Sequence, residues 1–423
     1  MLKRIGVHQL VLGMHLKEFC GSWMEHPFWR TGFVLTDPKD LEAILSSSIR
    51  EVWVDVSQGL DVPEGDTAVT EEQAQQQVSQ ALDSAHQNLE PPVQPPVQQL
   101  RNRRPVAAAQ EVERAARICL EAKAAVVSMF EEVRMGNAVD TGSAQELVEE
   151  ISDSVIRNPG AIISLARLKT ADDYTYMHSV AVCAMMVALA RQLALEDTVT
   201  RACGLAGLLH DMGKVAIPTT VLNKPGKLTE AEFATIKMHP TEGFHILQRS
   251  DSMDEVALDV VLHHHEKVDG SGYPKGLTSG QISLFSKMGS VCDVYDAITS
   301  NRPYKAGWDP AESMRKMAEW TKGHFDLRVF QGFVKSVGIY PVGSLVRLSS
   351  GRIGVVTEQA AGTLTAPIVK VFYSIKSGMR FEPVVLDLSR PHVTEKIVQR
   401  EDPAKWHFHD LNALWSGLPD YHA

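Results

Sequence analysis

The sequence has few cysteines and no long apolar segment, and each shortage excludes a class of protein. The five cysteines are scattered and odd in number, and no CxxC pair occurs. This usage argues against a disulfide framework or a zinc ribbon and indicates a reduced, cytoplasmic protein. No stretch approaches 18 uninterrupted apolar residues, and the N-terminus lacks a clean apolar signal core. We therefore predict neither a membrane span nor an export signal.

Positive charge is also in short supply. The chain carries 42 Lys and Arg against 52 Asp and Glu, which gives a formal net charge of −10 at pH 7. An acidic surface of this kind argues against binding to nucleic-acid polymers or to anionic membranes. An anionic ligand would need a pocket whose local positive charge outweighs the overall field.

The texture of the sequence changes three times and divides the chain into four predicted regions. Residues 1–60 alternate short apolar runs with turns, which predicts a small α/β regulatory domain. Residues 61–104 are rich in Gln and Pro and predict a linker. Residues 105–336 show helical periodicity almost throughout, and residues 337–423 return to the β-branched alternation of a β-rich extension. The predicted fold class is mainly α, with a helical core between a small α/β module and a β appendage.

The segment 106–134 is the longest amphipathic helix that the periodicity predicts. Two interpretations of its apolar face are open. The face packs within the helical domain, or it forms the contact of a homodimer.

Histidine and aspartate recur where the predicted helices end or face inward. Imidazole and carboxylate are suitable ligands for first-row divalent metals. An adjacent His-Asp pair at a helix end can give one ligand to each of two ions, with the aspartate bridging them. The candidates are His178, His210, Asp211, His239, the run His263, His264 and His265, and Asp293.

Each candidate also has a simpler interpretation. His178 alone suits a buried core histidine, His210-Asp211 a polar pair at a helix C-terminus, and His239 a helix-boundary residue. The histidine run and Asp293 are harder to explain in this way, because unpaired buried polar groups are costly. One metal cluster explains all of these residues together.

Two motifs in the sequence resemble those of a known family. "HDMGK" at 210–214 and "HHEKVDGSGYP" at 264–274 resemble the HD-GYP family, a branch of the HD-domain metal-dependent phosphohydrolases. The resemblance covers about residues 150–335 and includes "CDVYDAITSNRPYK" at 292–305. The N-terminal 60 residues resemble a small domain of unknown function that is often fused ahead of such modules.

The resemblance implies an HD-type helical bundle that uses a hydroxide activated by two metal ions to hydrolyse cyclic di-GMP. The product would be linear pGpG, with slower cleavage to GMP, in bacterial signalling that governs biofilm formation and motility. The implied metal ligands are His178, His210, Asp211, His239, His264, His265 and Asp293, with Asp211 bridging. Asp211 and Lys214 would serve catalysis, and Lys214, Tyr273, Arg302 and Lys305 would bind the substrate. A metal-bound water or Asp296 is the candidate to protonate the leaving oxygen.

Some family members bind a third ion through an acidic residue four positions before the first histidine. Tyr174 occupies that position here, so we predict two divalent ions. The histidine-rich set favours iron or manganese, and nickel or zinc stay open.

Two other functions stay open at this stage. The HD motif alone also suits a hydrolase of another nucleotide, and a non-catalytic sensor of cyclic di-GMP would need the same pocket. The motif "GSGYP" at 270–274 lies in the loop that gives the family its name, which we call the GYP loop. Some relatives use this loop to bind diguanylate cyclases, which makes these GGDEF-type proteins candidate partners.

Overall fold

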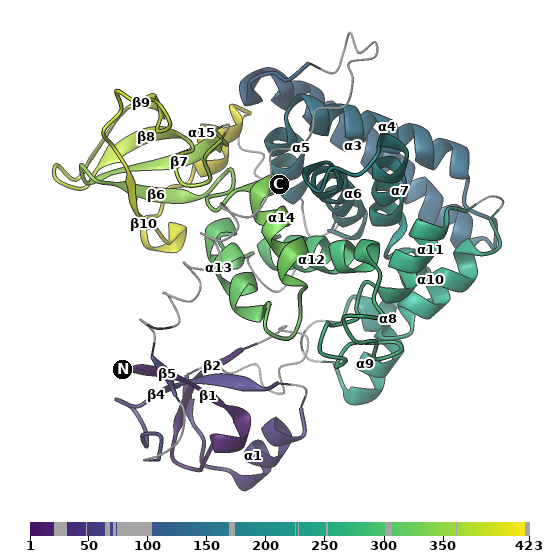
Figure 1. Ribbon diagram of the computed structural model, residues 1–423, viewed down its shortest axis with the longest axis horizontal. Coiled ribbons are helices and arrows are strands. Elements are labelled where there is room, and N and C mark those ends of the chain that lie inside the picture. The colour runs from purple at the N-terminus through teal and green to yellow at the C-terminus, as the bar shows by residue number, and fades with distance from the viewer. Residues whose placement is uncertain are drawn as a thin grey trace. The chain divides into compact units, whose positions relative to one another are not determined.

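The computed structural model describes most of the chain and is mainly helical, with one antiparallel sheet towards each end of the sequence (Figure 1). This confirms the predicted fold class. The described residues are 1–20, 32–47, 49–63, 68–70, 73, 104–168, 174–224, 226, 228–250, 253–300, 307–360 and 362–418. They form two compact units, residues 1–83 with 318–324 and residues 84–317 with 325–423. The four boundaries expected from the sequence stay predictions.

The first unit is built around a five-stranded antiparallel sheet with the strand order β3-β2-β4-β1-β5. Helix α1 (Pro38–Leu45) begins after Asp37, whose carboxylate accepts a hydrogen bond from the Lys39 backbone N–H and so caps the helix. Its buried core includes Leu16, Ile44 and Val52. The strands are β1 (Leu2–Gly6), β2 (His15–Cys20), β3 (Phe33–Val34), β4 (Glu51–Asp55) and β5 (Val69–Thr70), and η1 (Val7–Gln9) is a short 3₁₀ helix.

The helical part of the second unit surrounds α6 (Tyr174–Gln192). Residues 177–190 of this helix are buried on every side, because its sequence is apolar around the whole circumference. Helices α3, α4, α5, α7, α12 and α14 all contact it. The helices around α6 and those that follow in sequence are α3 (Ala108–Arg134), α4 (Thr141–Arg157), α5 (Pro159–Arg167), α7 (Asp197–Leu209), α8 (Thr219–Leu222), α9 (Glu230–Ile236), α10 (His239–Leu247), α11 (Glu255–His263), α12 (Leu284–Thr299), α13 (Pro310–Trp320) and α14 (Leu327–Val337), with the 3₁₀ helix η3 (Met212–Ala216).

Side-chain caps separate several of these helices where the sequence places Asp, Asn, Ser or Thr. Asp140 and Asn158 cap α4 and α5, and Asp254 and Ser283 cap α11 and α12. Each side-chain oxygen accepts from a backbone N–H in the first turn, which satisfies a donor that the helix itself leaves unpaired. The caps of α11 and α12 fix where two helices that position candidate ligands begin.

The C-terminal part of the second unit is the predicted β appendage. Its five strands are antiparallel in the order β10-β6-β7-β8-β9. Val346, Val356, Val369 and Val371 form the core of the sheet, as the β-branched alternation predicts. The strands are β6 (Leu345–Leu348), β7 (Arg352–Glu358), β8 (Ile368–Ser374), β9 (Met379–Asp387) and β10 (Ile397–Arg400), followed by η4 (Pro403–Lys405) and α15 (Leu411–Ser416).

None of the helices in the described part of the chain has the length and hydropathy that crossing a membrane requires.

Candidate metal centre

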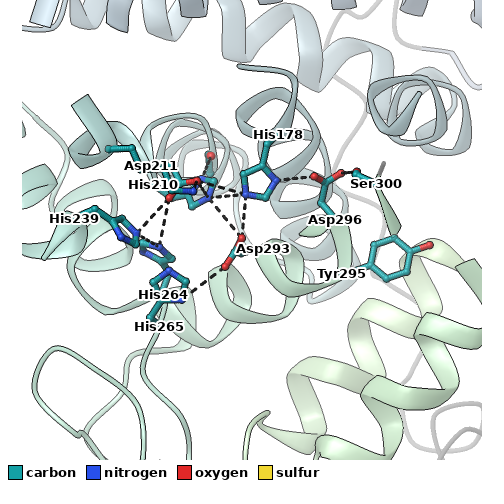
Figure 2. A network of polar contacts seen from close by, with 12 residues as sticks. His178, His210, Asp211, His239, His264, His265, Asp293, Tyr295, Asp296 and Ser300 are labelled. Atoms are coloured by element: carbon teal, nitrogen blue, oxygen red, sulfur yellow. Dashed lines mark hydrogen bonds and ion pairs between the residues drawn. The ribbon is translucent and has the colours of Figure 1, made fainter. Parts of the chain in front are cut away.

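The seven residues predicted as metal ligands come together inside the second unit (Figure 2). Three of them lie in α6, α10 and α12, and the other four lie in the turns that follow α7 and α11. Nearly all of them are buried. Their potential ligand atoms form two groups, in each of which these atoms lie within 4.8 Å of one another. We call His178, His210 and Asp211 the first group, and His239, His264 and His265 the second group. Asp293, in α12, faces both of them.

The turn after α7 brings the two groups into contact. His210 follows the last residue of α7, and Asp211 leads into the 3₁₀ helix η3. A Cβ atom at Gly213 would collide with the backbone carbonyl oxygen of His239 and with the backbone N of Gly243. Only glycine permits this close approach, which places the start of α10, and with it His239, beside Asp211.

Hydrogen bonds fix the tautomers of three histidines. The Nδ1 atoms of His210, His239 and His264 lie 2.8, 2.7 and 3.0 Å from the backbone carbonyl oxygens of Gly207, Ile236 and Val260. A carbonyl oxygen only accepts, so each Nδ1 carries the hydrogen, and each Nε2 of a neutral ring presents a lone pair.

In the second group these lone pairs point at one another, because the Nε2 atoms of His239 and His264 are 3.3 Å apart. In the first group the Nε2 atoms of His178 and His210 are 3.2 Å apart. Facing lone pairs repel unless a cation lies between them, and a metal ligand held by a hydrogen bond from its other ring nitrogen is the common arrangement in metal sites. The donor set therefore fits divalent metal ions.

Asp211 connects the two groups through its two carboxylate oxygens. Oδ2 lies 3.4 Å from His210 Nε2 and 3.6 Å from His178 Nε2, whereas Oδ1 lies 3.3 Å from His239 Nε2. Asp293 also directs one carboxylate oxygen at each group. Its Oδ1 lies 3.0 Å from His178 Nε2, and its Oδ2 lies 3.9 Å from His265 Nδ1. One carboxylate oxygen for each group is the geometry of a bridging ligand.

The surroundings favour the protonation states that metal ligands need. Burial alone would raise the pKa of Asp211, but the cations of Lys214 and His210 hold this pKa well below its usual range. Burial alone would also raise the pKa of Asp293. The hydrogen bond from His178 and the positive charge of His178 outweigh burial and hold this pKa well below its usual range. Burial and the neighbouring histidines lower the pKa of His264 to about 3. Charged carboxylates and a neutral imidazole are ready to bind a metal ion.

His210 differs from His264. Burial would lower its pKa, but the negative charges of Asp211 and Asp293 outweigh burial and raise this pKa above the usual value. A metal ion that binds His210 must therefore displace a proton.

Asp296 lies behind the first group. Its Oδ2 is 2.6 Å from His178 Nδ1, on the other edge of the ring from Nε2, and its Oδ1 accepts from the Ser300 hydroxyl at 3.2 Å. The residue is 2% exposed. This burial favours orientation of His178 over the proton donation to a leaving oxygen that the sequence suggested.

Two of the predicted substrate-binding residues lie at the edge of the centre. The Lys214 ammonium contacts Asp211 Oδ2, and the Lys214 side chain is 23% exposed. The Tyr273 ring stacks on the His265 ring, with 4.7 Å between centroids and 25° between planes. Arg302 and Lys305 lie outside the described residues, as does the side chain of Tyr174.

The sequence analysis missed one organising residue of the GYP loop. The Glu266 carboxylate is buried and accepts hydrogen bonds from the backbone N–H groups of Lys275 and Leu277 at 2.7 and 2.8 Å. The sequence does hold a signal for Glu266. This charged residue comes directly after the ligand histidines and before a Gly/Pro-rich loop, and such loops need acceptors for their backbone N–H groups.

Comparison with known proteins places these motifs in a family. A domain of unknown function (DUF3391) matches residues 2–144, and an HD domain matches residues 156–329. The chain is 53% identical over 419 residues to the cyclic di-GMP phosphodiesterase PA4108 of Pseudomonas aeruginosa, covering 99% of this chain and 96% of that protein. The chain belongs to the HD-GYP family. The resemblance inferred from the motifs is thereby confirmed.

Other relatives match a smaller share of the chain. The cyclic di-GMP phosphodiesterase response regulator RpfG of Xanthomonas campestris is 47% identical over 121 residues, which are 28% of this chain and 32% of that protein. The 3′3′-cGAMP-specific phosphodiesterase 1 of Vibrio cholerae is 37% identical over 164 residues, 38% of each chain. Relatives of this chain are thus named for different cyclic dinucleotides.

Proposed function

We propose that this protein is a metal-dependent phosphodiesterase that hydrolyses cyclic di-GMP to linear pGpG in bacterial signalling. The observation that carries the proposal is the pair of histidine groups that Asp211 joins through its two carboxylate oxygens, 3.3 and 3.4 Å from the nearest ring nitrogens. The 53% identity to a cyclic di-GMP phosphodiesterase over almost the whole chain supports this choice of substrate.

Two divalent metal ions fit the centre as one ion for each group. The first group with Asp293 would hold one ion, and the second group would hold the other, with Asp211 shared. Divalent ions bound in this way lower the pKa of a coordinated water and stabilise charge on phosphate oxygens. Five histidines and two aspartates favour iron or manganese, and nickel or zinc are the alternatives.

The protein's own side chains orient and bind the substrate in this proposal. The Lys214 ammonium, beside Asp211, would bind the phosphate and stabilise the charge that develops on it. Arg302 and Lys305 would hold phosphate as the family motif implies. Tyr273, which stacks on His265, would line the guanine pocket from the GYP loop. Together Lys214, Arg302 and Lys305 would give an acidic protein a locally positive pocket.

The alternative within enzymes is hydrolysis of another nucleotide. The relative of Vibrio cholerae named for 3′3′-cGAMP makes a second cyclic dinucleotide the specific competitor. The alternative from another class is a sensor that binds cyclic di-GMP without cleaving it.

We also propose that the protein acts in the cytoplasm and binds diguanylate cyclases through its GYP loop. A pull-down tests the second point. Tyr273→Ala should weaken capture of a purified GGDEF-type cyclase, whereas full capture by this variant would contradict the contact. A homodimer is a separate proposal, and the molar mass in solution tests it. The apolar face of α3 is buried against α4, α5 and α6, so a dimer contact would lie elsewhere on the surface.

Anaerobic turnover tests the proposed function directly. Protein reconstituted with Fe(II) or Mn(II) should convert cyclic di-GMP to pGpG, and chromatography measures the nucleotide products. Asp211→Ala should abolish the product. Asp140→Ala, which removes the cap of α4, is a control that should keep activity. Faster turnover of 3′3′-cGAMP would favour the second substrate. Tight nucleotide binding without product in metal-loaded protein would favour the sensor.

A further inference from the structure

A polar cluster outside the metal centre joins α11, which His264 and His265 follow, to α12, which carries Asp293. Asp259 in α11 and Ser283 and Ser286 at the start of α12 form this cluster with His263. We call these four residues the α11–α12 clamp. Both Asp259 oxygens are used, since Oδ1 accepts from His263 Nδ1 at 2.9 Å and Oδ2 accepts from the hydroxyl groups of Ser283 and Ser286.

The clamp holds the first turn of α12 in one position. Ser283 is the N-cap of this helix, and its oxygen accepts from the Ser286 backbone N–H at 3.0 Å while its hydroxyl donates to Asp259. The Ser286 hydroxyl lies 2.8 Å from Asp259 Oδ2 and 3.1 Å from the Asp259 backbone carbonyl oxygen. The start of α12 is therefore tied to both the side chain and the main chain of α11.

The same helix pair continues from the clamp to the metal ligands. At Gly289 the helices approach so closely that a Cβ atom would lie 2.8 Å from Val260 Cγ1 and 3.5 Å from His264 Cβ. Further along, His265 Nδ1 and Asp293 Oδ2 are 3.9 Å apart. One residue of α-helix rises about 1.5 Å, so even a small slide of α12 along α11 changes the distance between these ligand atoms.

The histidine run now divides by role. His264 and His265 belong to the second group of the metal centre, whereas the Nδ1 atom of His263 is bonded to Asp259. The His263 side chain is 13% exposed and the Asp259 side chain is 30% exposed, so this contact is half-buried directly beside the ligand His264.

We propose that Asp259 and His263 are positioning residues that set the register of α11 against α12 and thereby the spacing of His264, His265 and Asp293. This inference rests on the metal centre proposed above and not on the identity of the substrate. Neither residue touches the substrate or the ions. Their loss should weaken the ion held by the second group more than the ion held by the first.

The decisive experiment compares two aspartates on the same helix. Asp259→Ala breaks the clamp, whereas Asp254→Ala removes only the N-cap of α11, where the Asp254 carboxylate accepts from Val256 N–H at 2.8 Å. Mn(II) affinity is measured for the full-length chain by competition with a chelator, and the unfolding temperature of the metal-free protein is measured for both variants. Loss of an outer residue that orients metal ligands typically weakens metal affinity 10- to 100-fold. In Asp259→Ala we expect an affinity loss of this size for the ion held by the second group. In Asp254→Ala we expect no loss of affinity.

Variants of His263 refine the test. The amide of His263→Gln still donates a hydrogen bond to Asp259, so this variant should keep most of the Mn(II) affinity that His263→Leu loses. Equal Mn(II) affinities for Asp259→Ala and Asp254→Ala would overturn the inference, as would a loss in Asp259→Ala that falls equally on both ions. Wild-type protein that binds Mn(II) but releases no product from cyclic di-GMP would overturn the proposed function alone. Wild-type protein without a Mn(II) site would overturn both.

Discussion

The two groups of the metal centre use similar side chains in different surroundings. In the first group His178, His210 and Asp211 are each 1% exposed, and the Asp296 carboxylate lies behind His178. In the second group His239 and His264 are equally buried and, like His210, donate to backbone carbonyl groups, but no carboxylate of the described residues lies behind them. His265 lies under Tyr273 of the GYP loop, and its side chain is 12% exposed.

This difference indicates different tasks for the two groups. A carboxylate behind a ligand histidine raises the basicity of the ring and fixes its orientation. The first group should therefore bind its ion more tightly. The second group is bordered by the loop that we propose binds the nucleotide, so its ion should exchange more readily and respond to changes in that loop.

The largest expected effect comes from removing one histidine of each group. His178→Ala should lower turnover of cyclic di-GMP by roughly 10³-fold, because loss of an ion removes several kcal/mol of charge stabilisation. His265→Ala should lower turnover less, by roughly 10²-fold, since the ion of the first group, which we expect to bind more tightly, remains. Turnover and metal content after gel filtration measure both variants. A His265→Ala protein that loses more metal than His178→Ala would reverse the assignment of the tighter site.

A smaller effect should follow when the carboxylate behind His178 is neutralised. Asp296→Asn keeps the size of the side chain but weakens the hydrogen bond to Nδ1 and allows the wrong tautomer of His178. We expect a 10- to 100-fold loss of affinity for the first ion and little change for the second. A two-site Mn(II) titration measures both affinities. Ser300→Ala, which removes only the outer contact of Asp296, serves as the matched control and should change the affinity far less.

Much of the centre could be predicted because its ligands lie in short, local patterns. His210-Asp211 and His264-His265 are adjacent at helix ends, and Asp293 interrupts an apolar helix. Such residues stand out by their cost of burial alone. That His178 and Asp293 face each other across 115 positions of the sequence follows from the packing of α6 on α12. The metal hypothesis required that contact, but periodicity alone did not predict it.

The residues that the sequence did not reveal act through long-range contacts. Asp259 meets Ser283 from 24 positions away, and an aspartate on a helix face is usually solvated. Gly213 is needed because the backbone of His239 approaches it, which no local pattern shows. The two-residue strands β3 and β5 were also beyond prediction, since alternation needs about four residues to be visible.

A change of pH should separate the two groups by a moderate effect. The raised pKa of His210 means that near pH 6.5 this ring carries a second proton, on Nε2, in the metal-free protein. A metal ion must displace this proton, so affinity at the first group should fall as pH falls from 8 to 6, by at most about tenfold per pH unit. The lowered pKa values of His264 and His265 keep both rings neutral over this range. Affinity at the second group should stay nearly constant, and Mn(II) titrations at pH 6, 7 and 8 measure both.

The stability of the metal-free protein should follow the same shifts. Between pH 6.5 and about 3 the unfolded chain binds a proton at His264 that the folded protein does not. The stability from this residue is therefore present above pH 6.5 and is lost as pH falls through that window. His210 has the opposite sign, because its contribution is present below pH 6.5 and is lost as pH rises through its raised pKa. Urea unfolding of His264→Gln against wild type should show a smaller acid dependence in the variant, and an unchanged dependence would contradict the assignment.

The smallest expected effect lies at the GYP loop. Tyr273→Leu keeps an apolar side chain over His265 but removes the stacked ring, whose contribution in such pairs is about 0.5–1.5 kcal/mol. Affinity for the second ion should fall by about 2- to 10-fold, and affinity for the first ion should not change. Tyr273→Phe keeps the stacked ring and should bind both ions like wild type. If Tyr273→Leu weakened both ions equally, the loop would act on the whole centre, and the comparison between a tight and an exchangeable site would fail.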